Sequence, residues 1–223
     1  MAGRIYERRH RIALSISRIL TEAGVEHAFI GGFATKVLGS NRPTADIDVE
    51  INVTASNEII DRIRPLLLQE DYRFSIEHLK LYFTRDDDQR CRISVETLGI
   101  GTLGLPCRLS VIHLGATGNI PILHPGVLVL TKIKRYATLS ESTRPKSQAK
   151  ASTDIKDITY LLGWLEEHHE QVNFADYESP QPERLYDTVS QVAFTWRRDS
   201  RNELLQLQGS VLKQEDREKV MDT

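Results

Sequence analysis

The chain has 223 residues, of which 40% are hydrophobic and 27% are charged, and its formal net charge at pH 7 is -2. At this length and hydrophobic content the chain can bury a real core, and the near-neutral charge argues against a protein that binds nucleic acid in general. No stretch approaches the ~18 consecutive apolar residues of a membrane-spanning helix, and the basic segment from Gly3 to Arg11 lacks the apolar run of a signal peptide. The two cysteines, Cys91 and Cys107, are interpreted as buried free thiols in strands, which favours a cytoplasmic protein without a membrane partner.

Hydrophobic periodicity predicts a mixture of helices and strands in one enzyme-sized chain. The predicted elements are, in chain order, a helix at 5–23, a strand at 26–30, a helix at 33–38, a turn at 39–43, a strand at 45–53, a helix at 56–68, a strand-rich region at 73–112 with a hairpin turn at 85–89, a helix at 127–139, a mobile linker at 140–152, and helices at 153–169 and 182–196. We predict a catalytic core over 1–120, a helical part over 121–200 and a polar tail over 201–223.

The strand predicted at 45–53 alternates apolar and polar residues, and its polar positions begin with two aspartates. Asp46 and Asp48 are two residues apart, so they face the same side of the strand. Two carboxylates this close repel unless a cation lies between them, and hard oxygen ligands favour magnesium. A bare D-x-D pattern is also typical of an ordinary strand with a solvated acidic face, so its meaning depends on its neighbours.

A glycine pair, Gly31-Gly32, lies between the strand at 26–30 and the following helix. Glycine lets the backbone approach a phosphate closely, and the free amides at a helix N-terminus favour negative charge. The alternative is a tight strand-to-helix turn that binds nothing. The interval to Asp46 is long enough for a short helix and a turn, which would bring the glycines and the acids to one ligand.

These residues together resemble the signature of the nucleotidyltransferase superfamily, whose fold is that of DNA polymerase beta. The signature residues are Ile30, Gly31, Gly32, Asp46, Ile47, Asp48 and Val49. The string R-x-T-x-D-x-D, which starts at Arg42, is most similar to the AbiEii toxin-type and stand-alone antibiotic nucleotidyltransferase branches. The resemblance implies an α+β fold, in which a small mixed twisted sheet is flanked by helices and followed by a C-terminal helical extension.

Enzymes of this superfamily use a third carboxylate on a neighbouring strand, and Glu96 is the candidate. It lies in the alternating segment 92–98, where Ile93 and Val95 occupy the apolar face. Facing residues on paired strands lie about 4.5 to 5.5 Å apart at Cβ, so Glu96 would complete a metal site with the two aspartates. The alternative is a solvated strand glutamate, because the superfamily more often has aspartate followed by an apolar residue here.

The helical half contains a second group of charged residues. By resemblance, a lysine after the apolar run at 127–131 reaches the triphosphate, and Lys132 fits this position, with Lys134 as the alternative. The run from Lys150 is similar to K-x-x-x-D-x-x-D-I-x-x-L in AbiEii-like proteins. Its Asp154 and Asp157 are three residues apart and share a helical face, so they are predicted to position a lysine or the base. Helix dipole and capping effects explain part of the same pattern without a function.

The resemblance implies a metal-dependent nucleotidyltransferase with two magnesium ions. A nucleoside monophosphate would pass from an NTP to an acceptor hydroxyl, and pyrophosphate would leave. The expected catalytic and metal-binding residues are Asp46, Asp48 and Glu96, and the expected nucleotide-binding residues are Gly31, Gly32, Arg42, Thr44, Lys132 and Asp157. Within the latter group, a guanidinium can grip a phosphate with two hydrogen bonds, and Thr44 would orient Asp46.

Two other functions fit the same residues. A catalytically silent relative would bind a nucleotide or a partner, and a phosphohydrolase would use the same metals to release phosphate. RNA, a protein and a small molecule are all candidate acceptors. No motif in the sequence specifies the acceptor, the preferred NTP or the oligomeric state.

Overall fold

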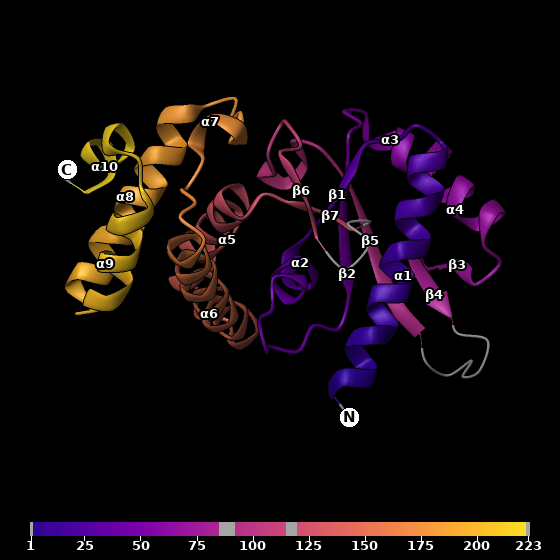
Figure 1. Cartoon of the computed structure of the whole chain (residues 1–223), viewed down its shortest axis with the longest axis horizontal. Coiled ribbons are helices and arrows are strands. Elements are labelled where there is room, and N and C mark those ends of the chain that lie inside the picture. Colours follow the sequence, from indigo (N-terminus) through magenta and orange to yellow (C-terminus); the bar gives the residue numbers. More distant parts are fainter. Residues whose placement is uncertain (1, 85–91, 115–119, 222–223) are drawn as a thin grey trace. The chain divides into compact units, whose positions relative to one another are not determined.

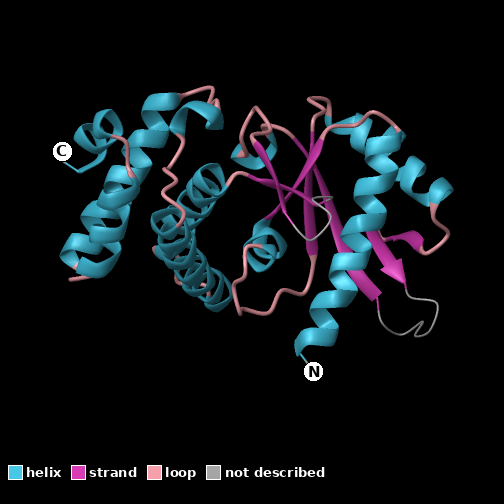
Figure 2. Cartoon of the chain, in the orientation of Figure 1, coloured by secondary structure: helices cyan, strands magenta, loops and turns pink. Residues whose placement is uncertain are grey.

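The structure, a computed structural model, describes residues 2–84, 92–114 and 120–221. Figure 1 labels its helices and strands along the chain, and Figure 2 distinguishes them by colour. None of the helices in these described ranges is long and apolar enough to cross a membrane. The hairpin turn predicted at 85–89 and the strand position predicted for Cys91 lie outside the described residues.

The chain divides into two compact units. The sheet unit comprises Met1–Leu103 and Val111–Leu123, and the helical unit comprises Gly104–Ser110 and His124–Thr223. The elements up to Leu123 are α1 (Ala2–Glu22), β1 (His27–Ile30), α2 (Gly31–Val37), β2 (Ile47–Ile51), α3 (Ser56–Glu58), the π-helical turn η1 (Ile59–Ile63), α4 (Arg64–Glu70), β3 (Phe74–Glu77), β4 (Lys80–Thr84), β5 (Arg92–Gly99), the 3-10 turn η2 (Thr102–Gly104), β6 (Val111–Leu114) and β7 (Ile120–Leu123).

The strands form one mixed sheet in the order β3-β4-β5-β2-β1-β7-β6. At its centre, β2 runs antiparallel to β1 and parallel to β5, and β1 runs parallel to β7. The sheet confirms the mixed α+β architecture expected from the sequence. It also places β2 and β5, the two strands that carry the candidate acids, side by side.

One face of the sheet is covered by helices of the same unit. On this face the His27 ring lies 3.0 Å from the Ser17 hydroxyl of α1, and Arg64 of α4 donates a hydrogen bond of 3.1 Å to the Thr97 hydroxyl. Register places the side chains of Phe29, Val49 and Thr97 on this face as well. Because side chains alternate along each strand, the opposite face carries Asp48, Glu50 and Glu96, and we call it the polar face.

The helical unit is built mainly from helices. They are α5 (Pro125–Ser140), α6 (Pro145–Glu167), α7 (Phe174–Tyr177), α8 (Pro182–Arg198), α9 (Asn202–Val211) and α10 (Gln214–Met221). The core of this unit contains Leu128, Leu161, Leu165 and the fully buried Trp196, whose indole ring lies 6.4 Å from the Tyr136 ring. Apolar residues at helical spacing on α5, α6 and α8 account for this packing.

Four sequence-based predictions differ from the structure. The segment 140–152, predicted as a mobile linker, contains the start of α6, because Pro145 occupies the first helical turn, where its missing N–H costs nothing. The segment 201–223, predicted as a polar tail, forms α9 and α10, because Leu204, Val211 and Val220 are buried there. Cys107 is a half-buried free thiol outside any strand, and the sheet unit extends beyond the predicted boundary at 120 to Leu123.

Candidate active site

The carboxylate of Asp48 lies directly against the backbone of Gly31. Asp48 is opposite Ile30 in the β1–β2 register, so the glycine that follows Ile30 meets the same carboxylate. A Cβ atom added to Gly31 would lie only 2.0 Å from Asp48 Oδ2, and the residue has a φ of +66. Both the close contact and the left-handed backbone require glycine here. The first glycine of the pair therefore brings the start of α2 to the acid on β2.

We expect Gly31→Ala to destabilise the protein more than Gly24→Ala does. The two glycines have nearly the same φ, but a Cβ at Gly24 would meet nothing within 4 Å. A left-handed alanine costs roughly 1 to 2 kcal/mol at either position, and only Gly31→Ala must also displace the carboxylate. Urea unfolding of both variants measures the difference. Equal losses of unfolding free energy would show that Asp48 moves away without cost.

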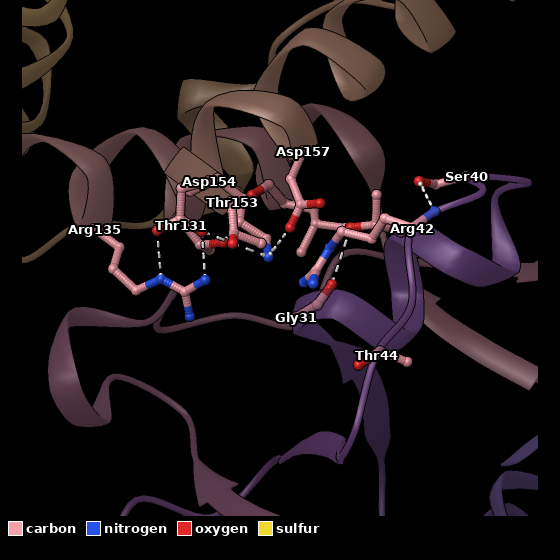
Figure 3. A network of polar contacts seen from close by, with 12 residues as sticks. Gly31, Ser40, Arg42, Thr44, Thr131, Arg135, Thr153, Asp154 and Asp157 are labelled. Carbon is pink, nitrogen blue, oxygen red and sulfur yellow. Dashed lines mark hydrogen bonds and ion pairs between the residues drawn. The ribbon is translucent and has the colours of Figure 1, made fainter. Parts of the chain in front are cut away.

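The second glycine lies under two polar side chains of the loop that leads to β2. A Cβ at Gly32 would lie 2.4 Å from Arg42 Nη2 and 2.9 Å from Thr44 Oγ1. Figure 3 shows Arg42 and Thr44 close to the start of α2, with the Arg42 amide donating to the Ser40 hydroxyl at 3.3 Å. The predicted nucleotide-binding residues of the sheet unit are thus gathered around the glycine pair.

The two predicted aspartates have different environments. Asp48 lies within β2 and is half-buried, whereas Asp46 precedes the strand and is exposed. Thr44 Oγ1 lies 3.3 Å from Asp46 Oδ1 and 3.3 Å from its backbone carbonyl oxygen, so the hydrogen bond predicted between these residues is present. The position of Asp46 is set by this loop rather than by the strand pairing that fixes Asp48.

Arg9 of α1 also contacts this loop, which the sequence did not indicate. Its Nη2 donates a hydrogen bond of 3.3 Å to the carbonyl oxygen of Ala45, the residue before Asp46. In the sequence, this arginine stood out only as part of the basic segment from Gly3 to Arg11. A long-range hydrogen bond of this kind leaves no signal in local sequence, because it depends on how α1 packs on the sheet.

Glu96 is the direct neighbour of Asp48 across the sheet. The parallel register of β2 and β5 pairs Asp48 with Glu96, so both side chains project from the polar face. Two hard oxygen donors on adjacent strands fit a divalent cation such as magnesium. Among the described residues, however, no three Asp, Glu, His or Cys side chains are close enough together to hold a metal ion. The assignment of Asp46, Asp48 and Glu96 as metal ligands therefore stays a prediction.

Glu50 is a third acid on the polar face, and no role was predicted for it. Its side chain is fully buried, and neither carboxylate oxygen has a hydrogen-bond partner among the described residues. Register places it between Ala28 and Leu98, two apolar neighbours. Burial raises the pKa of Glu50 to about 8, because the charged form loses its hydration. Glu50 is therefore mainly neutral at pH 7.

We expect Glu50 to make the protein less stable as pH rises. The pKa of Glu50 is about 8 in the folded protein, whereas its ordinary value is 4.5. Its contribution to stability is therefore complete below pH 4.5 and is lost as pH rises to 8. The slope approaches roughly 1.4 kcal/mol per pH unit in this window. Denaturation of wild type and Glu50→Gln in a chelating buffer measures it, with the exposed Glu70→Gln as control. The same slope in Glu50→Gln would contradict the assignment.

In the helical unit, Lys132 and the two aspartates of α6 form a buried charge cluster. Lys132 Nζ lies 2.6 Å from Asp157 Oδ2 and 3.9 Å from Asp154 Oδ1, and all three side chains are almost completely buried. Arg135 holds Asp154 through two hydrogen bonds, drawn in Figure 3. Burial lowers the pKa of Lys132, and the charge of Asp157 opposes this shift.

These contacts agree with the prediction that the aspartates position a lysine. The alternative lysine, Lys134, is placed differently: its Nζ donates a hydrogen bond of 2.7 Å to the Gly104 carbonyl and lies 4.9 Å from the centre of the Tyr177 ring. Lys132 is thus the lysine that the two aspartates hold. Its contact with a triphosphate stays a prediction.

No protein-family model matches the chain, and no curated protein sequence matches it either. Among solved structures, an antigenic nucleotidyltransferase-like protein from Paracoccidioides brasiliensis matches with a TM-score of 0.67 and 18% identity, over 96% of each chain. The antibiotic-resistance factor ANT(2'')-Ia matches with a TM-score of 0.40 and 15% identity, over 76% of this chain and 98% of that one. CdnC from E. coli MS115-1, in complex with HORMA-deltaN, matches with a TM-score of 0.34 and 14% identity, over 87% of this chain and 64% of that one.

The match to the P. brasiliensis protein covers nearly the whole of both chains, so the two proteins share a fold. The fold expected from the glycine pair and the D-x-D pattern is confirmed by this likeness. The chain has the nucleotidyltransferase fold.

Proposed function

We propose that this nucleotidyltransferase-fold protein transfers a nucleoside monophosphate from an NTP to an acceptor hydroxyl and releases pyrophosphate. One observation carries the proposal: the Asp48 carboxylate lies against Gly31 on one side and has Glu96 as its register neighbour on the other. The turn that we propose to bind phosphate and the two acids thus lie beside one another at the polar face. The R-x-T-x-D-x-D string from Arg42 favours an enzyme of the AbiEii type.

The phosphates would bind at the start of α2. The backbone amides there have no side-chain cap, and glycine leaves room for a phosphate to approach them. Arg42, which lies over Gly32, would bind a phosphate oxygen through its guanidinium. Within the helical unit, Asp157 holds the ammonium of Lys132, whose role toward a triphosphate stays a prediction.

Asp48 and Glu96 would hold magnesium, and the exposed Asp46 would join them by a change of side-chain rotamer. Magnesium bound there supplies positive charge that neutralises the phosphate oxygens in the transition state. Glu96 would accept the proton of the acceptor hydroxyl. The acceptor oxygen then bonds to the α-phosphorus, the bond to the bridging oxygen breaks, and that oxygen leaves with pyrophosphate.

Incubation of the purified protein with each α-labelled NTP, magnesium and separate pools of RNA, protein and small molecules tests the proposal. We expect a labelled adduct in one pool together with one pyrophosphate per label transferred. Tight NTP binding without an adduct would instead identify a catalytically silent relative. Release of inorganic phosphate without an adduct would identify a phosphohydrolase.

A further inference from the structure

The β3–β4 hairpin ends beside the candidate carboxylates of the polar face. The register of β4 and β5 pairs Leu81 with Val95, so one step further along the strands Lys80 falls opposite Glu96. Glu96 in turn pairs with Asp48. Side chains opposite one another across a sheet share a face. Lys80, Glu96 and Asp48 therefore form a row across three neighbouring strands.

Lys80 contributes an available positive charge to this row. Its side chain is exposed, and it forms no ion pair with any residue in the described part of the chain. Its partner in the hairpin register is Glu77, but that carboxylate is paired with Arg92. The lysine ammonium is long enough to extend over Glu96, which lies one strand away.

The turn next to Lys80 is both strained and exposed. His78 and Leu79 have φ values of 49 and 64, in the left-handed region that favours glycine or asparagine, and Leu79 is 81% exposed. Arg64 fixes this turn, because it donates one hydrogen bond of 2.8 Å to the Leu79 carbonyl and another of 3.1 Å to the Thr97 hydroxyl. The turn is thereby tied to the residue after Glu96. Strain held in place beside a reactive group is characteristic of binding sites.

The order of strands separates the two substrates of the proposed reaction. Gly31 and Gly32 follow β1, whereas Glu96 lies on the other side of Asp48, on β5. In-line transfer requires the attacking hydroxyl and the leaving pyrophosphate on opposite sides of the α-phosphorus. With the triphosphate at the glycine pair, the acceptor lies over β5 and β4. An acceptor in that position would meet Lys80 and Leu79.

We propose that the end of the β3–β4 hairpin binds the acceptor, with Lys80 contacting a phosphate next to the reacting hydroxyl and Leu79 packing against an apolar ring. This inference rests on the proposed function. Its chemistry selects an acceptor that joins an anion to a flat apolar group, namely a nucleotide, either free or at the end of an RNA strand. It disfavours a polycationic acceptor, because the ammonium of Lys80 would repel it.

A matched pair of fluorescent oligoribonucleotides tests the role of Lys80. They differ only in the last linkage, which is a phosphodiester in one and an uncharged methylphosphonate in the other. We expect wild type to transfer label to the phosphodiester with a kcat/KM about tenfold higher, as one charge-assisted hydrogen bond predicts. Lys80→Ala loses this preference and Lys80→Arg retains most of it, while the KM for NTP is unchanged in both. A preference that persists in Lys80→Ala overturns the proposal.

Further variants and acceptors complete the experiment. Arg62→Ala removes an exposed charge from η1 and serves as the control for net charge. Leu79→Asn keeps a residue that tolerates the left-handed backbone but removes the apolar side chain, and it raises the KM of both oligonucleotides alike. A free mononucleotide as acceptor distinguishes the two sources: a KM as low as that of the oligonucleotide identifies free nucleotides, and a much higher KM identifies RNA ends.

The proposed transfer activity and the role of Lys80 are disproved by different results. If wild type transfers no label to any acceptor, the proposed function is wrong. Fluorescence anisotropy with the same oligonucleotides then still reports on Lys80. Equal affinity of wild type and Lys80→Ala for the phosphodiester oligonucleotide would overturn the hairpin as a binding element.

Discussion

Asp48→Asn is expected to lower nucleotide transfer by at least about 100-fold while the fold remains intact. Asparagine keeps the size of the side chain that packs against Gly31, so the contact with the glycine pair survives. It removes the negative charge that would hold magnesium beside Glu96. The loss of this electrostatic stabilisation corresponds to about 3 kcal/mol or more in the barrier. Transfer of α-labelled NTP by the two proteins, at equal concentration and saturating magnesium, measures the effect.

Asp46→Asn and Asp61→Asn complete this comparison. Asp46 is exposed and lies before β2, so Asp46→Asn tests the predicted ligand that the strand does not hold in place. Asp61→Asn removes an exposed acid from η1 and serves as the control for a change of charge by one unit. A transfer rate in Asp48→Asn within twofold of wild type would remove the basis of the proposed function.

Asp157→Asn is expected to destabilise the helical unit by roughly 3 to 5 kcal/mol, because it leaves the Lys132 ammonium buried with a weaker partner. The exposed pair of Arg18 and Glu22 gives a matched comparison. Glu22→Gln removes a surface ion pair of 2.7 Å, close to the 2.6 Å of Lys132 and Asp157. That variant should cost less than about 1 kcal/mol. Guanidinium unfolding of the single variants measures both costs.

A double variant separates the destabilisation caused by an unpaired buried charge from the net contribution of the ion pair to stability. Lys132→Met combined with Asp157→Leu removes both buried charges, and we expect it to recover most of the stability lost in Asp157→Asn. A cost for Asp157→Asn as small as that of Glu22→Gln would show that Lys132 finds other partners. Loss of NTP binding in a stable double variant would support the predicted triphosphate contact.

The alternation of residues 45–53 was sufficient to predict β2 and the side on which Asp48 projects. Local sequence also indicated the glycine turn, because few other residues allow a strand to enter a helix so closely. The adjacency of Asp48 and Glu96 followed only after β5 was assumed to lie beside β2. That pairing depends on contacts between residues far apart in the chain, which periodicity does not encode.

Other features were not predictable from local pattern. A polar residue on an alternating strand is expected to be solvated, yet Glu50 is buried, because burial depends on what covers the strand. The His78-Leu79 turn lacks the glycine or asparagine that marks a tight hairpin, so its left-handed backbone gave no signal. Helical spacing placed Asp154 and Asp157 on one face of α6, but only the packing of α5 against it identified Lys132 and Arg135 as their partners.

The path of the chain between the two units determines how the protein can be synthesised and divided. Gly104–Ser110 belongs to the helical unit but is inserted before β6 and β7, which complete the sheet. The Gly104 carbonyl accepts hydrogen bonds from Lys134 and Tyr177, both of which leave the ribosome later. If the chain is cut at any single peptide bond and the fragments are separated, at least one of the two units therefore lacks part of its own sequence. Separate expression of the two halves requires a rearranged gene, in which the inserted segment is moved to the second half.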